Sequence, residues 1–521
     1  MLRNKTKKES DKGNGGDPWR LMEKGSGRTI LNIFLLLVAA FLCSNFLEFS
    51  ISKATLRVFL KSKPWNQWNP SSDQSKKLGG IQWKCTPTVN QTYSCPIPLI
   101  SPAVTYESRK DDDDDHEKAG GSCPDYFKWI HEDLRPWKVT GITREMVERG
   151  AKSSADFRLV IVNGRAYIER YKTSFQTRDL FTWWGIVQLL RKYPGKLPDL
   201  DLIFNCADQP QIRSSDYQQP NASAPPPLFQ YSGNASSLPI VFPDWSFWGW
   251  PELNIKPWEV LLKELKESNE RTKWIDRQPY AFWKGNPFTS QSRKDLMKCN
   301  STYTDKQDWK LRAYAQDWKS EILHGFKQSD LTKQCTHRYK IYVEGRSWSV
   351  SQKHALACDS VPLFVEPKFY DFVTRSLIPM YHYWPIKRND DMCKSIKFAV
   401  DWGNIYKQEA QAIGRAASNF IQEELKMDYV YDYMLNLLKE YAKLLKYKPT
   451  IPERAFEHCS ETMACPADGL VKKYMTDSMV KAPADTSPCT MPPPFDRPAM
   501  QAFLNQKDVT KMQVEAMGRT L

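Results

Sequence analysis

The stretch that decides the fold is YKIYVEGRSWSVSQKHALACDSVPLFVEP, residues 339–367. Two runs of β-forming residues, 339–343 and 361–365, enclose a segment, 349–357, with the composition of a helix. The order predicts a strand, a loop, a helix and a second strand. Because such a connection joins parallel strands, we expect the loop at 344–346 to lie at the carboxyl edge of a parallel sheet, where α/β proteins bind ligands.

The loop and the first turn of the predicted helix, GRSWSVSQK (345–353), suit a nucleoside diphosphate. They contain a flexible glycine, hydroxyl groups, an aromatic ring and two cations. Backbone N–H groups at a helix N-terminus and arginine bind phosphate oxygens, and an aromatic ring can stack on a base. The alternative is an ordinary serine cap that begins a helix. We expect His354 to be structural.

Strands and helices alternate on both sides of this unit. Upstream, a β-hairpin is predicted at 157–162 and 165–170 around Asn163-Gly164, followed by a helix at 179–192 and a strand at 200–205. Downstream of these, the patterns predict an amphipathic helix from about 256, a strand and turn at 280–287, and helices from about 404 to 447. The alternation indicates an α/β protein.

Asp208 is the sharpest catalytic candidate. It follows the carboxyl end of the predicted buried strand at 200–205, where a carboxylate can act as a general base. The alternative is a turn residue that begins the loop before Pro210.

Three further sites carry weaker signals. Asp199 and Asp201 have the D-x-D spacing of metal-dependent glycosyltransferases, but the spacing also fits a polar strand entrance, which we favour. Lys284-Gly285-Asn286, at the end of a predicted strand, and Arg293 could add charge near a nucleotide phosphate. The motifs of serine hydrolases and zincins are absent from the sequence, as is a regular basic-aromatic array for nucleic acid.

The chain has 521 residues, a length that predicts two or three domains. Residues 29–47 carry no charge, and as a helix they would span roughly 28 Å, enough to cross a bilayer. We interpret 29–49 as a transmembrane signal-anchor that follows a basic cytosolic tail at 1–28. The alternatives are a cleaved signal peptide and a buried helix.

Cysteines and glycosylation sequons support a luminal body after this span. Eleven of the twelve cysteines follow it, so at least one is expected to be free or intermolecular. Four sequons also follow it, and we predict glycosylation at these four, Asn90, Asn221, Asn234 and Asn300. Together these signals predict a type II single-pass protein.

The remaining boundaries follow from composition. Residues 50–118 are predicted to be a luminal stem that ends in a run of five aspartates, which we interpret as a solvated linker rather than a calcium site. Two domains are then predicted at 119–255, on the acceptor side, and at 256–450, on the nucleotide-sugar side. Residues 451–521 show little pattern and are described only as a C-terminal tail.

Across residues 120–447 the chain resembles the Rumi/CAP10-like protein O-glucosyltransferases, glycosyltransferase family 90, and their plant members most. The resemblance rests on ordered segments: LPDLDLIFNCADQPQI (197–212), FPDWSFWGWPE (242–252), AFWKGNPFTSQSRKDLMKC (281–299), the opening stretch at 339–367, FYDF (369–372), HYWPI (382–386), FAVDWGN (398–404) and FIQEELKMDYVYDYMLNLLKEYAKL (420–444). It implies a GT-B fold, in which two Rossmann-like domains face across a cleft.

The resemblance also implies residue roles. Asp208 matches the base aspartate of the family's R-D-Y-P segment, although Ala207 and Gln209 flank it here. Cys335 and Cys358 match a disulfide pair. The substrate-binding residues are then expected to be Asn286, Arg293, Gly345, Arg346, Ser347, Trp348, Ser349, Val350 and Ser351. Ser351 and Lys284 stand where the family has arginine.

The function implied by the resemblance is inverting, metal-independent transfer of glucose or xylose from UDP-glucose or UDP-xylose to a hydroxyl group of a protein or cell-wall glycan. No cofactor is expected, because the UDP-sugar is a substrate. We expect residence in the Golgi membrane, with the endoplasmic reticulum as the alternative. The alternative functions are a catalytically silent sugar-binding or scaffold protein of the same fold, and a metal-dependent GT-A enzyme that uses Asp199 and Asp201.

The net charge of +14, from 74 basic and 60 acidic side chains, is consistent with this topology. The predicted cytosolic tail contains eight basic and four acidic residues. The rest of the excess lies beyond the predicted span, so nucleic acid is not expected as a partner, and part of it is available to bind a nucleotide diphosphate.

Overall fold

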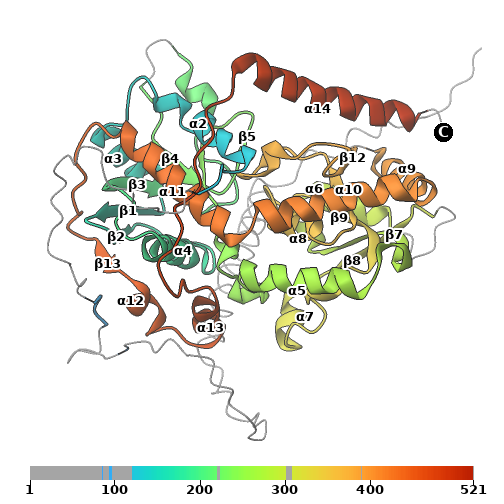
Figure 1. Cartoon of the computed structure of the whole chain (residues 1–521), viewed down its shortest axis with the longest axis horizontal. Helices are drawn as coiled ribbons and strands as arrows, with labels where there is room; N and C mark the ends of the chain where they lie inside the picture. Colours follow the sequence, from blue (N-terminus) through green and yellow to red (C-terminus); the bar gives the residue numbers. More distant parts are fainter. Residues whose placement is uncertain are drawn as a thin grey trace, which may run out of the picture. The chain divides into compact units, whose positions relative to one another are not determined.

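The computed structural model describes residues 85, 93–96, 120–219, 223–300, 308–388 and 390–519. These residues form a mixed α/β fold with two main sheets (Figure 1). The first sheet has the strand order β13-β2-β1-β3-β4-β6, and the second has the order β12-β10-β9-β7-β8. We call the parts built on them the N-terminal lobe and the C-terminal lobe.

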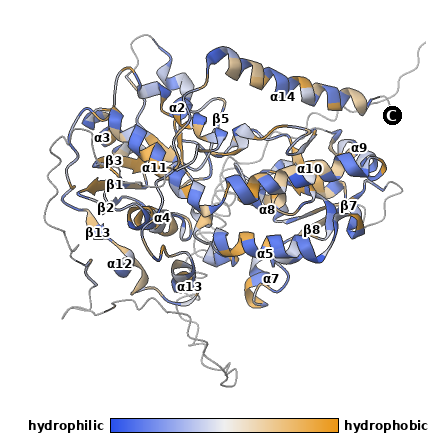
Figure 2. Cartoon of the chain, in the orientation of Figure 1, coloured by the Kyte–Doolittle hydropathy of each residue, from blue (hydrophilic) through white to orange (hydrophobic). Residues whose placement is uncertain are grey.

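The N-terminal lobe begins with the predicted hairpin. Strands β1 (Phe157–Val162) and β2 (Arg165–Arg170) pair antiparallel through a turn in which Asn163 and Gly164 both have positive φ, so this prediction is confirmed. β3 (Leu200–Phe204) pairs antiparallel with β1 and is buried along its whole length. Figure 2 shows β1 and β3 in the hydrophobic colour, as expected for central strands.

Short strands extend the sheet beyond β3 in the parallel sense. They are β4 (Leu228–Gln230) and β6 (Ile240–Val241). Helix α3 (Arg144–Ser153) packs on β3, and a Cβ at its Gly150 would lie 2.2 Å from the Ile203 side chain. The sheet and its covering helices therefore bring the carboxyl ends of β3 and β4 to the same edge.

Helix α4 (Arg178–Lys192) lies where 179–192 was predicted to be helical, and it is buried on almost every side. Its neighbours are the short 3₁₀ turn at Trp245–Phe247, α11 (Met427–Leu444) and α12 (Ser460–Ala464). A helix that is apolar all round is stable only when such elements cover it. Its first residue, Arg178, becomes part of the candidate site described below.

The C-terminal lobe contains the predicted βαβ unit. Strands β9 (His337–Tyr342) and β10 (Val361–Val365) are parallel, so the prediction from the opening stretch is confirmed. The helix between them, α8 (Ser351–Leu356), has only six residues and begins two residues later than expected. All pairings in this sheet are parallel, with β7 (Gln278–Gly285), β8 (Leu311–Ala315) and β12 (Trp384–Ile386) completing it.

Several helices cover this second sheet or connect it to the first. They are α5 (Trp258–Arg271), α6 (Gln291–Lys298), α7 (Trp318–Leu323), α9 (Met392–Ile405) and α10 (Lys407–Asn419). The predicted helical region 404–447 contains a π-helical turn at Phe420–Glu424, after which α11 packs on α4 and β3. The apolar face of α11 is thus buried in the N-terminal lobe, although its residues lie in the range 256–450 that was expected to form the C-terminal domain.

Residues 451–519 contain more structure than their composition indicated. They form β13 (Phe456–His458), which pairs with β2, and α12, α13 (Gly469–Asp477) and α14 (Arg497–Met517). Three disulfides attach earlier cysteines to this segment: Cys85–Cys465, Cys95–Cys459 and Cys123–Cys489. The expected stem therefore contributes two cysteines to the folded body.

The other two disulfides lie in the C-terminal lobe. Cys335–Cys358 confirms the pair that the family resemblance implied, and Cys299–Cys393 joins the end of α6 to α9. Cys206 is a buried free thiol, as the odd number of cysteines required.

Several predictions fall outside the described residues. They are the cytosolic tail, the span at 29–49, most of the stem, Asn90 and Asn221. Within the part of the chain that the structure describes, none of the helices has the length and apolar character needed to cross a membrane.

Candidate active site

The segment after β3 is held rigidly. The Asn205 side chain donates to the carbonyl of Ser154 (2.7 Å) and accepts from the Ala207 N–H (2.9 Å). The Asp156 carboxylate accepts from the Cys206 N–H at 2.7 Å. These local bonds replace the strand ladder where β3 ends, so the backbone leading to Asp208 has a defined path.

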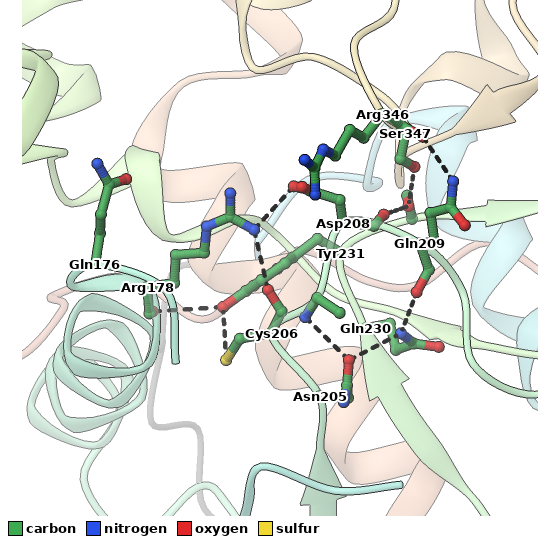
Figure 3. Close-up of polar contacts among 12 residues, drawn as sticks. Gln176, Arg178, Asn205, Cys206, Asp208, Gln209, Gln230, Tyr231, Arg346 and Ser347 are labelled. Atoms are coloured by element: carbon green, nitrogen blue, oxygen red, sulfur yellow. Dashed lines mark hydrogen bonds and ion pairs between the residues drawn. The ribbon is translucent and has the colours of Figure 1, made fainter. Parts of the chain in front are cut away.

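The Asp208 carboxylate is paired with an arginine. Arg178 Nη1 donates to Asp208 Oδ1 at 2.8 Å and to the Cys206 carbonyl at 3.1 Å (Figure 3). The Asp208 side chain is 35% exposed, whereas that of Arg178 is 7% exposed. The predicted base thus has one oxygen held from the protein side and remains accessible.

The loop after β9 is anchored at Glu344. This buried carboxylate is ion-paired with Arg388 and accepts the N–H of Phe369 at 2.7 Å. Burial raises the pKa of Glu344, and the Phe369 N–H and Arg388 oppose that shift. The anchor fixes the start of the loop, and the predicted binding residues follow directly.

Arg293, predicted to bind phosphate, is largely occupied by the loop itself. Its guanidinium donates to the backbone carbonyls of Glu344 (3.1 Å), Asn286 (3.2 Å) and Val343 (3.2 Å), and to the hydroxyl of Ser349 (3.2 Å). Burial lowers its pKa to about 10. None of these four acceptors is a carboxylate. Arg293 therefore holds the loop and places a positive charge beneath it.

The residues of the loop differ in exposure and in whether their side chains have hydrogen-bond partners. The Arg346 side chain is exposed, and its guanidinium has no hydrogen bond among the described residues; Figure 3 shows it extending toward Asp208. Ser349 Oγ contacts Ser351 Oγ at 2.9 Å. At Gly345 a Cβ would lie 3.4 Å from Thr289 Oγ1, which is an ordinary van der Waals contact. Val350 is half-buried.

Trp348 differs from the expectation of a stacking surface for a base. It is 6% exposed, and its ring lies 5.7 Å from that of Tyr231 and 6.1 Å from that of Trp245. Both partners belong to the N-terminal lobe, where apolar surface is removed from water. Trp348 therefore packs the loop onto that lobe.

Hydrogen bonds join the loop after β9 to the segment that carries Asp208. Gln209 Nε2 donates to the Arg346 carbonyl at 3.1 Å, and the hydroxyls of Ser232 and Ser347 are 2.9 Å apart (Figure 3). The Ser232 hydroxyl also donates to the Asp208 carbonyl at 3.2 Å. The structure thus brings together two segments more than 130 residues apart in sequence.

Two other predicted groups have structural partners. Asn286 caps a short 3₁₀ turn by accepting the Phe288 N–H at 2.9 Å, and Lys284 is paired with Glu321 at 3.5 Å. His354 is buried, with its pKa lowered well below the ordinary value by that burial and by nearby lysines.

The D-x-D carboxylates face away from the site. Asp201 is fully buried and accepts from Arg158 (2.7 and 2.5 Å) and from the Tyr447 hydroxyl (2.9 Å). Asp199 accepts the Asn163 N–H at 2.8 Å. These partners agree with the interpretation of the motif as a strand entrance.

Sequence reasoning missed Arg178 and Ser232. Each lies more than 20 residues from Asp208, and neither belongs to a recognisable motif. The only local signal at Arg178 was its position at the start of a predicted helix, which says nothing about the residue it contacts.

The family of the chain follows from comparisons with known proteins. A family model described as glycosyl transferase family 90 matches residues 118–518. The chain is 26% identical over 343 residues to protein O-glucosyltransferase 1 of Bos taurus and of Homo sapiens, which covers 63% of this chain and 82% of each relative. It is also 26% identical over 339 residues to O-glucosyltransferase rumi of Drosophila melanogaster, covering 63% of this chain and 78% of that relative. The chain belongs to glycosyl transferase family 90 and is a glycosyltransferase of the Rumi/CAP10-like type.

Proposed function

We propose that the protein is an inverting, metal-independent glycosyltransferase that moves glucose or xylose from a UDP-sugar to a hydroxyl group of a protein or cell-wall glycan. The supporting observation is that the Arg346 carbonyl accepts from Gln209, next to Asp208, and that Ser347 is linked to the Asp208 carbonyl through the Ser232 hydroxyl. A UDP leaving group bound to the loop at Arg346 and Ser347 would therefore lie beside Asp208, the assigned base. The printed names of the relatives, protein O-glucosyltransferases, favour glucose and a protein acceptor.

In the proposed reaction, the acceptor oxygen attacks the anomeric carbon while its proton passes to Asp208. The bond from that carbon to the UDP oxygen breaks with inversion, and UDP leaves with the electron pair. The free guanidinium of Arg346 would neutralise the charge that grows on the diphosphate. Arg293 would add a buried positive charge beneath the loop, whose shape it maintains. The two lobes would correspond to the two domains of a GT-B enzyme.

We also propose a location in the Golgi lumen, with 29–49 as the membrane anchor and the endoplasmic reticulum as the alternative. Five disulfides among the described cysteines support an oxidising compartment. The reaction as written needs no cofactor, since the activated sugar enters as a substrate.

The test is a screen of UDP-sugars against secreted proteins, peptides and wall oligosaccharides, with UDP release as the readout. With the UDP-sugar and acceptor that give the fastest UDP release, Asp208→Asn is expected to lower kcat by roughly 10² to 10⁴-fold, because it removes the proton acceptor. The matched control is Asp199→Asn, which keeps the oxygen that accepts the Asn163 N–H and is expected to retain wild-type turnover.

Three outcomes would contradict this proposal. If the wild-type protein binds UDP but releases none from any pair, it is the silent binding protein. Turnover that survives Asp208→Asn would exclude the assigned base. Loss of turnover on adding a chelator, together with loss in Asp199→Asn, would indicate the metal-dependent alternative.

A further inference from the structure

Arg178 fixes the orientation of Asp208 from an unusual position. It is the first residue of α4, and one nitrogen, Nη1, donates both to Asp208 Oδ1 (2.8 Å) and to the Cys206 carbonyl (3.1 Å). The side chain of Asp208 and the backbone two residues before it are thus tied to the same point. Since the guanidinium group is planar and the Arg178 side chain is only 7% exposed, this double contact restricts the rotation of the carboxylate.

Aromatic rings enclose the guanidinium. Its central carbon lies 4.4 Å from the ring centroid of Trp245, 5.2 Å from that of Phe175 and 5.9 Å from that of Trp250. Trp250 is held in turn by its indole N–H, which donates to Gln176 at 2.8 Å. Cation–π contacts of this kind stabilise a charge that is removed from water and keep it in one place.

The two oxygens of Asp208 differ as a result. Oδ1 accepts from Arg178, whereas Oδ2 has no hydrogen bond within the described part of the chain, and the side chain remains 35% exposed. The Ser232 hydroxyl donates to the Asp208 carbonyl at 3.2 Å. Backbone and side chain are therefore both restrained, with one carboxylate oxygen left for another molecule.

We propose that Arg178 is a positioning residue of the transferase site, which holds Asp208 by Oδ1 so that Oδ2 receives the acceptor proton. The inference rests on the proposed function. When the acceptor oxygen bonds to the anomeric carbon and UDP departs, the proton moves to Oδ2 and the resulting carboxylic acid remains hydrogen-bonded to Arg178 through Oδ1. A misaligned base would lower the rate of this step without changing how UDP binds.

The experiment compares Arg178→Ala and Arg178→Lys with the wild-type full-length protein, using UDP for calorimetry and the best donor and acceptor pair for turnover. Arg178→Ala is expected to lower kcat by about 10²-fold, as for a misplaced catalytic group, with the Kd for UDP within about twofold of wild type. Arg178→Lys should recover part of the rate, since it keeps the charge but not the planar fork. Added guanidinium chloride at millimolar concentration should partly restore Arg178→Ala but not Asp208→Asn.

Two results would overturn the proposal: wild-type kcat in Arg178→Ala, or a loss of UDP affinity as large as the loss of kcat, which would mean that Arg178 merely supports the fold. If Arg178→Ala does not fold, the turnover of Phe175→Ala is measured in its place. Phe175 is 66% exposed, so its removal leaves the core intact while it opens one side of the guanidinium.

The matched control is Phe456→Ala, because Phe456 is 74% exposed on the edge strand β13, which β2 and β1 separate from β3, the strand that precedes Asp208. Phe175→Ala is expected to lower kcat by about fivefold, from the loss of one cation–π contact of roughly 1 kcal/mol, and Phe456→Ala to leave it unchanged. Equal rates in the two variants, or a higher acceptor KM with kcat unchanged, would refute the positioning role. Failure of the proposed function can be distinguished from failure of this inference. If the proposed function is wrong, the wild type releases no UDP, or Asp208→Asn keeps wild-type turnover.

Discussion

At the scale of single residues, the candidate site is organised by two arginines that donate hydrogen bonds to backbone oxygens. Arg293 holds three carbonyls from the ends of β7 and β9, and Arg178 holds one carbonyl beside Asp208. A buried carbonyl without a donor costs about 1–3 kcal/mol, so each arginine stabilises the path of the chain around it. The positive charge that could receive a diphosphate is thereby kept next to the loop that would bind it.

We predict that Arg293→Lys weakens UDP binding by about tenfold or more and lowers Tm, because an ammonium group cannot reproduce the planar set of contacts to the carbonyls. Calorimetry with UDP and thermal unfolding would measure the two effects. Lys294→Met, an exposed neighbour on α6, should match the wild type in both. Wild-type UDP affinity in Arg293→Lys would show that the loop keeps its shape without this residue.

A second residue-scale prediction concerns Lys340 on β9. Burial, followed by the nearby Arg277, lowers the pKa of Lys340 to about 7. In the unfolded chain the amine keeps its proton to about pH 10.4, so between about pH 7 and pH 10 the unfolded state binds more protons than the folded state. From this residue alone, the free energy of unfolding should rise across that window by up to about 1.4 kcal/mol per pH unit.

Chemical denaturation between pH 7 and pH 9.5 would measure this dependence. Lys340→Met should reduce the slope of the free energy of unfolding against pH, whereas Lys294→Met should keep it. An unchanged slope in Lys340→Met would mean that the amine stays protonated in the folded protein throughout the window.

At the scale of elements, residues 451–491 complete the N-terminal lobe. β13 forms the edge of the first sheet beside β2, and α12 packs on α4, where Gln188 Nε2 donates to Ser460 Oγ at 3.2 Å. The three disulfides to earlier cysteines end in this same segment. By contrast, α14 is largely exposed, with Val514 as its one buried residue among those described.

We therefore predict different effects from two truncations. A chain that ends at residue 450 should fail to accumulate in folded form in a eukaryotic host, because it loses an edge strand, the cover of α4 and three disulfides, each typically worth about 2–4 kcal/mol. A chain that ends at residue 492 loses only α14 and the segment before it, and should accumulate in folded form with a modestly lower Tm. The yield of folded protein and thermal unfolding would test this, and equal yields would contradict it.

At the scale of the whole molecule, passage through the secretory pathway can be tested at the two described sequons. Asn300 Nδ2 donates to the Ala313 carbonyl (2.7 Å) and its Oδ1 accepts the Ala313 N–H (3.2 Å), so its amide is bonded to the backbone of β8. Asn234 uses only its Oδ1 among the described contacts, accepting the Ser236 N–H at 2.9 Å. A glycan attached to Asn300 would disturb the pairing with β8.

In protein produced in a eukaryotic host, we expect glycan occupancy at Asn234 to exceed that at Asn300. Peptide mass spectrometry after enzymatic deglycosylation in heavy-oxygen water would give both values from one sample. Asn300 thus serves as an internal control, because it is a sequon in the same protein whose side-chain amide is hydrogen-bonded to the Ala313 backbone. Full occupancy at Asn300, or none at Asn234, would contradict the prediction.

The sequence by itself determined the local framework. The βαβ unit at 339–365, the hairpin at Asn163-Gly164 and helix α4 were all predicted, because periodicity, turn residues and β-branched runs act over a few neighbouring positions. The pair Cys335–Cys358 and the membership of the family followed from ordered motifs along the chain.

Only the tertiary structure decided which of these parts meet. The burial of Trp348 against Tyr231, the contacts of Arg293 with the loop, and the role of residues 451–491 depend on partners tens to hundreds of residues away. The pairing of Arg178 with Asp208 is of the same kind: the free energy of burying an arginine depends on which oxygens and rings surround it. Those surroundings exist only once the helix start and the strand end have been packed together.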